Sequence, residues 1–319
     1  MENTINGLHH ITVISGDPQV NYDFYTKILG MRFVKKTVNF DAPDVYHLYY
    51  ADEVGTPGTV LTFFPFPNAK RGTRGNGEAT IVSFSIPKNS LDFWIERLSK
   101  YDVQFDGPSE KFGYKFISFL DPDGMKIELV EDDVDHFIGW ETNEVSREYS
   151  VRKFFGTTLY LDDSEATEDL LKNVFGFKLL SEQGNIKRYI SGEGDHEAKL
   201  DIIVNPNAQI GIQSAGTIHH IAWRTESDQS QIKWINKLRK AGYQTTDVVD
   251  RNYFHSIYFR EPGGVLFEIA TDGPGFMIDE NLETLGESLK LPEQYESRRE
   301  QIERILIPLN QTNVTLNEK

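Results

Sequence analysis

The chain has 319 residues, 39% of them hydrophobic and 12% aromatic, a length that favours about two domains with large buried cores. Its 33 basic and 49 acidic residues give a net charge of −16. This charge argues against nucleic acid and anionic membranes as partners, because phosphate binding depends on clustered lysine and arginine. The absence of cysteine excludes disulfides, thiolate catalysis and cysteine zinc sites. With no signal peptide and no membrane-length apolar run in the sequence, we expect a cytoplasmic protein.

Internal repeats organise the sequence. The segment LDFWIERLSK at 91–100 matches QIKWINKLRK at 231–240, and FLDPDGMKIELVED at 119–132 matches FREPGGVLFEIATD at 259–272 with the same spacing. Such self-similarity indicates that one structural module has been used more than once.

A second match, between YDFYTKILGMRFV at 22–34 and TEDLLKNVFGFKLL at 167–180, relates two further segments. Each unit begins with an apolar run, continues with an amphipathic stretch that ends near glycine, and closes with short strand-like runs, which predicts a βαβββ module. The four units lie at 5–66, 77–131, 152–205 and 217–272.

The fold class predicted from these modules is α+β. We expect the four modules to pair into two domains, each a cup-shaped open β-barrel with outer helices: an N-terminal domain at 1–135 and a C-terminal domain at 150–272. Turns such as Asp121-Pro122-Asp123-Gly124 and Glu261-Pro262-Gly263-Gly264 predict hairpins, because proline fixes φ and glycine accepts positive φ.

Two segments lie outside the modules. The Gly-rich, basic stretch at 67–78 is expected to link units one and two and to border the pocket. The tail at 273–319 is expected to contain a helix from Pro292 to Leu306 with Tyr295, Ile302, Ile305 and Leu306 on its apolar side. This tail would either cover a cup as a lid or pack on the outside of the C-terminal half.

Two His-His pairs and one glutamate recur at equivalent places in the repeats. They lie in LHHIT at 8–12, TIHHIAW at 217–223 and GGVLFEIA at 263–270. Since alternate strand residues face opposite sides, one histidine of each pair can face a cup. A glutamate in such an apolar strand needs a metal or another cation to stay charged. Ordinary packing of a His-His pair is the alternative, and its recurrence at equivalent repeat starts argues against it.

The other units lack parts of this set. His219 and His220 align with Ala79 and Thr80, and His10 aligns with Gly156, whereas Glu268 aligns with a second glutamate, Glu128. We therefore predict one metal site, built from units one and four.

These motifs resemble the vicinal oxygen chelate superfamily, and specifically its hydroquinone-type ring-cleaving dioxygenases, over about residues 5–272. The resemblance implies Fe(II) held by His10, His220 and Glu268, with Mn(II) as the alternative metal. It also implies a small aromatic substrate and O2 as partners. Further positions that match the family's substrate pocket or the surroundings of its ligands are His9, His219, Thr12, Arg251 and Tyr258. Independently, two histidines and one carboxylate leave coordination positions open, as non-haem iron oxygenases require.

Roles for the residues around the ligands follow from their chemistry. Tyr258 could donate a proton or hydrogen bond, and Arg251 could hold negative charge, although it could instead pair only with Asp247 or Asp250. His9 and His219 could orient the ligands or shuttle protons.

The remaining histidines have plainer interpretations. His47 is expected to be an ordinary strand histidine, and His255 a rim residue outside the ligand set. His136 and His196, in acidic loop-like surroundings, are expected to be exposed to solvent.

The favoured function is Fe(II)-dependent cleavage of a hydroquinone or catechol ring, used in quinone detoxification. The first alternative is a glyoxalase-like isomerase or thiol transferase, which needs a fourth ligand from unit one. Aligning PGTVLTFF at 57–64 with PGGVLFEI at 262–269 places Phe63 there; phenylalanine cannot ligate and would make that side of the cup apolar. The second alternative is a metal-free sequestering protein, which would not need the ligand set. The sequence leaves the substrate and a homo-oligomeric state open.

Overall fold

The computed structural model describes residues 4–134 and 137–311, and each of the four units folds as the expected βαβββ module. Units one and two contain β1 (Leu8–Ser15), α1 (Pro18–Asp23), β2 (Arg32–Asn39), β3 (Ala42–Ala51), β4 (Val60–Pro65), β5 (Glu78–Pro87), α2 (Leu91–Lys100), β6 (Phe105–Lys111), β7 (Tyr114–Leu120) and β8 (Lys126–Asp132). Units three and four contain β9 (Phe154–Leu161), α3 (Glu165–Asp169), β10 (Lys178–Gln183), β11 (Ile186–Ser191), β12 (Ala198–Val204), β13 (Thr217–Thr225), α4 (Asp228–Lys240), β14 (Val249–Asp250), β15 (Phe254–Arg260) and β16 (Leu266–Pro274). The helices of units one and three continue as π-helical turns at Phe24–Ile28 and Leu170–Phe175.

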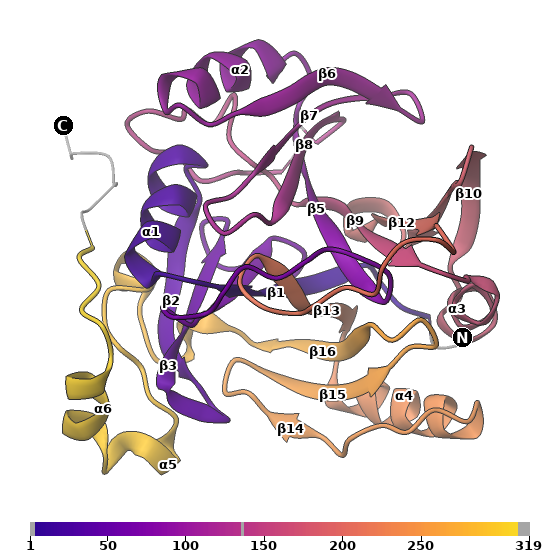
Figure 1. Ribbon diagram of the computed structural model, residues 1–319. Coiled ribbons are helices and arrows are strands. Elements are labelled where there is room, and N and C mark those ends of the chain that lie inside the picture. Colours follow the sequence, from indigo (N-terminus) through magenta and orange to yellow (C-terminus); the bar gives the residue numbers. More distant parts are fainter. Residues whose placement is uncertain (1–3, 135–136, 312–319) are drawn as a thin grey trace.

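The strands form two eight-stranded sheets that each combine modules from both halves of the chain (Figure 1). The first sheet has the order β14-β15-β16-β13-β1-β4-β3-β2, and the second has the order β10-β11-β12-β9-β5-β8-β7-β6. Antiparallel pairing of β1 with β13 joins unit one to unit four, and pairing of β5 with β9 joins unit two to unit three. The sheets therefore do not follow the expected grouping into halves 1–135 and 150–272, because the first strand of each module pairs across the halves.

Apolar faces of the helices pack on the sheets. Trp94 and Leu98 of α2 are fully buried, as are Trp234 and Leu238 of α4, and the two helices lie at opposite ends of the molecule (Figure 1). The predicted hairpins are present. In the β7–β8 hairpin, the Asp121 carboxylate accepts hydrogen bonds from the backbone N–H groups of Asp123 and Met125. In the β15–β16 hairpin, the Glu261 carboxylate accepts one from the backbone N–H of Val265.

The segment 67–78 runs beside a second linker, and none of its residues lines the cavity next to His10 and His220. Isolated bridges join Arg71 to Ala215, Thr73 to Ile212 and Asn76 to Ile210. At the end of this segment Glu78 is 8% exposed, and both of its carboxylate oxygens lack a hydrogen-bond partner within the described part of the chain. Burial raises the pKa of Glu78 to about 7.

We expect Glu78→Gln to stabilise the protein at pH 8 and to leave it nearly unchanged at pH 5. The pKa of Glu78 is above its ordinary value of 4.5, so the folded protein keeps a proton that the unfolded chain loses, and stability falls as pH rises from about 4.5 to about 7. The gain at pH 8 should be about 1–3 kcal/mol in urea unfolding. A difference that does not change between the two pH values would contradict this assignment.

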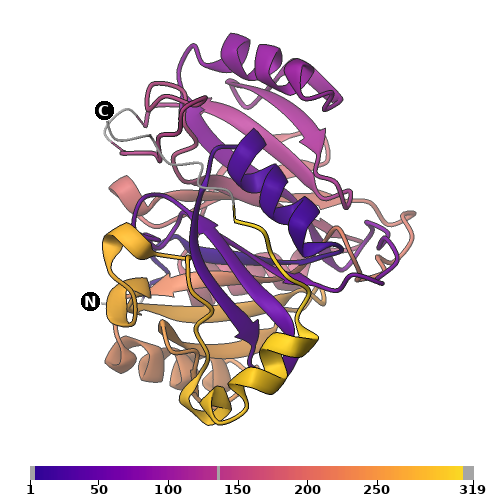
Figure 2. The same cartoon turned by 90° about the vertical axis from the view of Figure 1, so that its left-hand side faces the viewer.

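Most of the described C-terminal tail packs beside unit one rather than forming a lid (Figures 1 and 2), and its first residues also contact unit four, where the Phe276 ring lies 5.1 Å from that of Tyr253. Buried Lys35 of β2 contacts Asp279 at 2.6 Å and Glu280 at 2.5 Å, and the Tyr295 hydroxyl donates to the carbonyl of Phe40 at 2.7 Å.

The expected helix from 292 to 306 is divided into α5 (Glu293–Glu296) and α6 (Arg299–Ile305). It breaks because the backbone at Arg298 has φ −110° and ψ 10°, outside the helical region. Ile302 is buried as expected, whereas Ile305 is 53% exposed.

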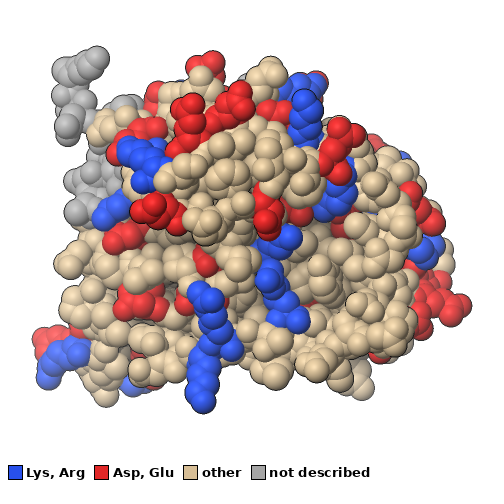
Figure 3. Space-filling view, turned by 45° about the horizontal axis from the view of Figure 1, so that its top comes forward, with Lys and Arg blue, Asp and Glu red and all other residues tan. Residues whose placement is uncertain are grey.

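Lysine and arginine are interspersed with aspartate and glutamate on the face shown in Figure 3. Among the described helices, none has the length and apolar character that a membrane crossing requires.

Candidate metal site and cavity

The structure brings His10, His220 and Glu268 together at the centre of the first sheet. The Nε2 atoms of the two histidines are 3.2 Å apart, and Glu268 Oε2 lies 3.3 Å from His10 Nε2 and 2.9 Å from His220 Nε2. All three side chains are buried, Glu268 completely. They come from β1, β13 and β16, which are neighbours in the sheet. Within residues 4–134 and 137–311, this is the one group of three side chains suited to hold a metal ion.

The geometry of these atoms fits a metal ion. Ligand atoms bound at about 2.1 Å and at right angles lie about 3 Å apart, which matches the three observed separations. Glu268 Oε2 is buried and lacks a correctly oriented hydrogen bond despite the two nearby nitrogens. Burial opposes the charge on Glu268, but the electrostatic and hydrogen-bond interactions with His10 and His220 outweigh it and hold the pKa of Glu268 well below its usual value. The carboxylate is therefore ionised and directed at a point shared with two imidazoles, as a metal site requires.

A second histidine supports each of the two ligand histidines. The Nδ1 atoms of His9 and His10 are 2.9 Å apart, and those of His219 and His220 are 2.8 Å apart. The Ser256 hydroxyl donates to the other oxygen of Glu268. Burial lowers the pKa of His9, and it lowers the pKa of His219 to about 3, so both imidazoles are neutral at neutral pH. These contacts fix the ring orientations and leave each ligand Nε2 directed at the shared point.

We expect His219→Ala to weaken metal affinity by roughly 10–100-fold, because the partner that orients His220 is lost. Competition with a chelator measures this change directly. His255→Ala is the matched control, since His255 lies on the same sheet but hydrogen-bonds Asp228 at 2.6 Å. Equal affinity in His219→Ala and His255→Ala would contradict the orienting role.

A cavity of about 310 Å³ opens above the three ligands. It is lined by His10, Asn39, Phe40, Asp41, His47, Tyr49, Phe64, His219, His220, Arg251, Phe254, Tyr258 and Leu266. The mixture of aromatic walls and a few convergent polar groups is typical of a site for a small ring-shaped molecule.

Arg251 and Tyr258 form one unit in this cavity. Arg251 Nε donates to the Tyr258 hydroxyl at 3.0 Å, and Arg251 Nη1 contacts Asp41 at 3.4 Å, so the expected pairing with Asp247 or Asp250 is wrong. Burial and the nearby Glu268 charge raise the pKa of Tyr258. The phenol therefore keeps its proton at neutral pH and can donate it into the cavity.

Of the two places that the resemblance implied for Thr12, the structure shows the one close to the ligands: Thr12 does not line the cavity, but it is the register partner of His220 across β1 and β13. It is fully buried, and its hydroxyl lies 2.8 Å from the Thr62 hydroxyl. His47, expected to be an ordinary strand histidine, does line the cavity. The signal for it was present, because His47 and Tyr49 alternate on β3 and so face the same side of the sheet.

The expected place of Phe63 is also wrong. Its ring is completely buried against Tyr25, at 4.6 Å between centroids, and Tyr50, at 5.7 Å, in the core on the other side of the sheet. Thr62 and Phe64 flank it on β4 and point the other way, and Phe64 supplies the apolar cavity wall.

The other described histidines lie away from this cavity. His255 is outside the ligand set as expected, but it does not line the cavity rim. His196 is exposed and contacts Arg224, and His136 falls outside the described residues.

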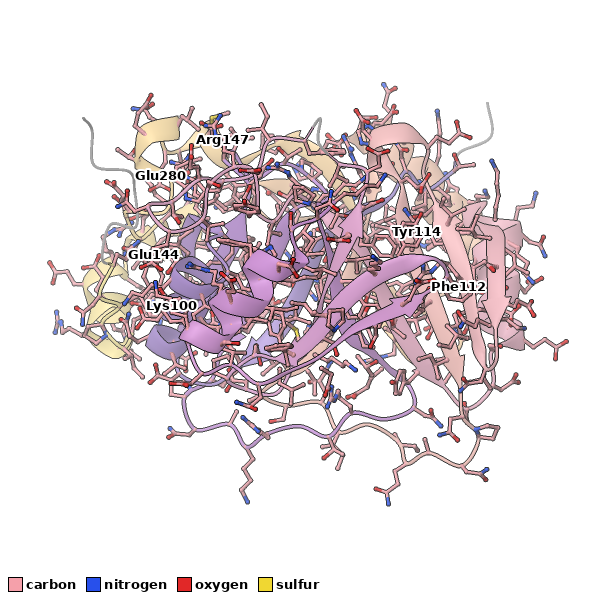
Figure 4. All side chains as sticks on the ribbon, turned by 90° about the horizontal axis from the view of Figure 1, so that it is seen from above. Lys100, Phe112, Tyr114, Glu144, Arg147 and Glu280 are labelled. Carbon is pink, nitrogen blue, oxygen red and sulfur yellow. The ribbon has the colours of Figure 1, made fainter. Side chains whose placement is uncertain are left out.

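The second sheet holds a closed ion cluster where the first sheet holds the candidate metal site. Glu128, the counterpart of Glu268, is buried and lies 3.3 Å from Lys111 Nζ, which is also 3.1 Å from Asp201. Arg188 donates two hydrogen bonds to Asp201, at 2.7 and 2.8 Å, and lies 4.4 Å from the Phe112 ring. Phe112 lies with Tyr114 at the tip of the β6–β7 hairpin, whereas Lys100, the last residue of α2, lies with Glu144 in another part of the molecule (Figure 4). Lys111 and Arg188 thus balance the charges of Glu128 and Asp201.

The fold and these residues define a recognisable class of protein. The chain belongs to the Glyoxalase/Bleomycin resistance protein/Dioxygenase superfamily, whose sequence model matches residues 7–129 and 153–269. Similar proteins include "Putative ring-cleaving dioxygenase MhqO" of Bacillus subtilis (strain 168), which is 45% identical over 95% of this chain and 96% of that protein. "Chlorohydroquinone/hydroquinone 1,2-dioxygenase" of Sphingobium indicum is 37% identical, over 95% of this chain and 96% of that protein.

Solved structures show the same fold. The crystal structure of a "putative dioxygenase" from Bacillus subtilis covers 97% of this chain and 99% of its own, with a TM-score of 0.93 and 44% identity. Glyoxalase I from Zea mays shares the fold at 14% identity, with a TM-score of 0.60 over 83% of this chain and 92% of its own.

Proposed function

We propose that this protein is an Fe(II)-dependent dioxygenase that cleaves the ring of a hydroquinone or a catechol. The observation that carries the proposal is the buried His10, His220 and Glu268 cluster beneath an aromatic cavity. The names of the similar proteins point in the same direction. Mn(II) is the alternative metal, since the same donor atoms accept both ions. Removal of quinols in the cytoplasm is part of the proposal.

The protein residues would bind the ring and manage its protons. Bound Fe(II) would supply the redox chemistry and would favour ionisation of a substrate hydroxyl. Phe64, Phe254 and Leu266 pack around a flat ring and exclude water, which strengthens the electrostatic interactions inside the cavity.

Two polar residues are placed to act on the substrate. Tyr258 would donate its proton to the oxygen on which negative charge develops, and Arg251, which donates to the same phenol, would stabilise that charge. His9 and His219 would keep His10 and His220 in the binding orientation.

The two alternatives are less well supported by the site. An isomerase or thiol transferase would need a further ligand from unit one; the strand register puts Thr62, which has no carboxylate, at the position equivalent to Glu268. A sequestering protein would have no use for two histidines and a buried carboxylate converging on one point.

Oxygen uptake by protein loaded anaerobically with Fe(II) tests the proposal. A panel of methyl- and chloro-substituted hydroquinones and catechols should include compounds that consume about one O2 per ring-opened product, the stoichiometry of a dioxygenase. Protein that holds one iron per chain but consumes no oxygen with any member of the panel would contradict it.

A further inference from the structure

The part of the cup that unit one contributes contains a continuous chain of hydrogen bonds. Tyr49 Oη lies 2.7 Å from His47 Nδ1, and His47 Nε2 lies 2.8 Å from Thr62 Oγ1. Thr62 Oγ1 is in turn 2.8 Å from Thr12 Oγ1. The His47 ring also packs on Tyr49, at 4.0 Å between centroids, and on Phe64, at 4.4 Å. Both ring nitrogens of His47 are therefore engaged and two aromatic rings contact it, which restricts its orientation.

Strand register makes Thr62 the counterpart of Glu268. Parallel pairing of β1 with β4 places Thr12 beside Thr62, and parallel pairing of β13 with β16 places Ala222 beside Glu268. Thr12 lies two residues after His10 on β1, and Ala222 lies two residues after His220 on β13. Thr62 and Glu268, their respective partners, are therefore at equivalent positions. The cup therefore has two related carboxylate positions, and unit one carries a hydroxyl at its own.

The Thr62 hydroxyl is held on both sides. A hydroxyl has one donor and two acceptor sites, and its described hydrogen bonds run to His47 and Thr12, not to any of the three ligands. A buried hydroxyl with two such partners would lose both bonds if it turned toward a metal ion.

We propose that His47 is a positioning residue that acts through Thr62. It holds the Thr62 hydroxyl away from the metal, so that unit one adds no fourth ligand and the positions needed by O2 and substrate stay open. Tyr49 completes the arrangement by fixing the other nitrogen of His47. The inference rests on the proposed function for the use of those open positions, but its effect on metal coordination does not depend on turnover.

Thr62→Glu tests the position directly. With a second carboxylate in the cup, we expect one metal per chain, bound at least about tenfold more tightly, and a Co(II) absorption spectrum that differs from that of the wild type. Oxygen uptake should fall below about 1% of the wild-type rate, because an open position is filled. Thr62→Val is the size-matched control and should keep the wild-type metal affinity within about threefold. Wild-type Co(II) spectrum and affinity in folded Thr62→Glu would overturn the inference.

His47→Phe tests the positioning role without adding a ligand, and it decides the matter if Thr62→Glu does not fold. We expect one metal per chain, an altered Co(II) spectrum and a kcat reduced by roughly tenfold, with recovery in His47→Gln, which restores hydrogen bonding. A Co(II) spectrum identical to that of the wild type would overturn the proposal. If the wild type consumes no oxygen, the proposed function fails, but the Co(II) spectra and metal affinities still test this inference.

Discussion

Replacement of His220 with alanine is expected to abolish stoichiometric metal binding and to lower oxygen uptake by at least about 1,000-fold, because metal-ion chemistry contributes several kcal/mol. The two remaining ligands, His10 and Glu268, are 3.3 Å apart and cannot enclose an ion on three sides. Glu268 also loses the contact at 2.9 Å that helps to keep it ionised. Metal content by elemental analysis and oxygen uptake by electrode measure the two effects.

The control for His220→Ala is His255→Ala, which removes a histidine from the same sheet without touching the cavity. It should retain one metal per chain and oxygen uptake within about twofold of the wild type, as surface substitutions usually do. A His220→Ala protein that keeps both its metal and its activity would show that the cluster is not the metal site.

Tyr258→Phe is expected to lower kcat by about 100–1,000-fold while metal content stays at one per chain, because a positioned proton donor typically contributes that much. The phenol is partly buried, keeps its proton at neutral pH and receives a hydrogen bond from Arg251. Its ring lies edge-on to His220 at 5.8 Å between centroids, which places the Tyr258 ring beside the candidate metal ligands. Phenylalanine preserves the ring contact and removes only the hydroxyl.

Tyr253→Phe is the matched control for this substitution. The Tyr253 hydroxyl donates to Asp279 at 3.0 Å, outside the cavity lining, so its removal should change kcat by less than about threefold. Steady-state kinetics over a range of pH separates the two variants. A Tyr258→Phe enzyme with the kcat and pH profile of the wild type would remove Tyr258 from the mechanism.

The sequence contained enough information to bring the three candidate ligands together. His10, His220 and Glu268 lie in strongly patterned strands, and their place in the repeats required units one and four to share a cup. The first sheet contains that arrangement, since β1, β13 and β16 are neighbours. Which modules form each sheet was harder to predict, because local pattern does not specify pairing between first strands that are distant in the chain.

The error at Phe63 arose from strand register. The hairpin letters PGTVLTFF and PGGVLFEI align well, but the strands are displaced by one residue relative to that alignment. A slip of one residue moves a side chain to the other face of the sheet, so Phe63 lies in the core and Thr62 faces the cup. His47 was missed for a related reason. Its alternation with Tyr49 shows that the two side chains face the same side of β3, but which side faces the cup depends on the register of the neighbouring strand that carries Thr62, and the sequence alone does not define that register.

Reaction with ¹⁸O₂ tests the central claim most directly. Fe(II)-loaded protein, a substituted hydroquinone and ¹⁸O₂ should give a ring-opened product whose mass shows incorporation of both atoms of one O2 molecule, allowing for exchange with water. The same experiment with His220→Ala should give no labelled product. A ring-opened product without label, or consumption of O2 with release of quinone and an intact ring, would contradict the assignment of this protein as a ring-cleaving dioxygenase.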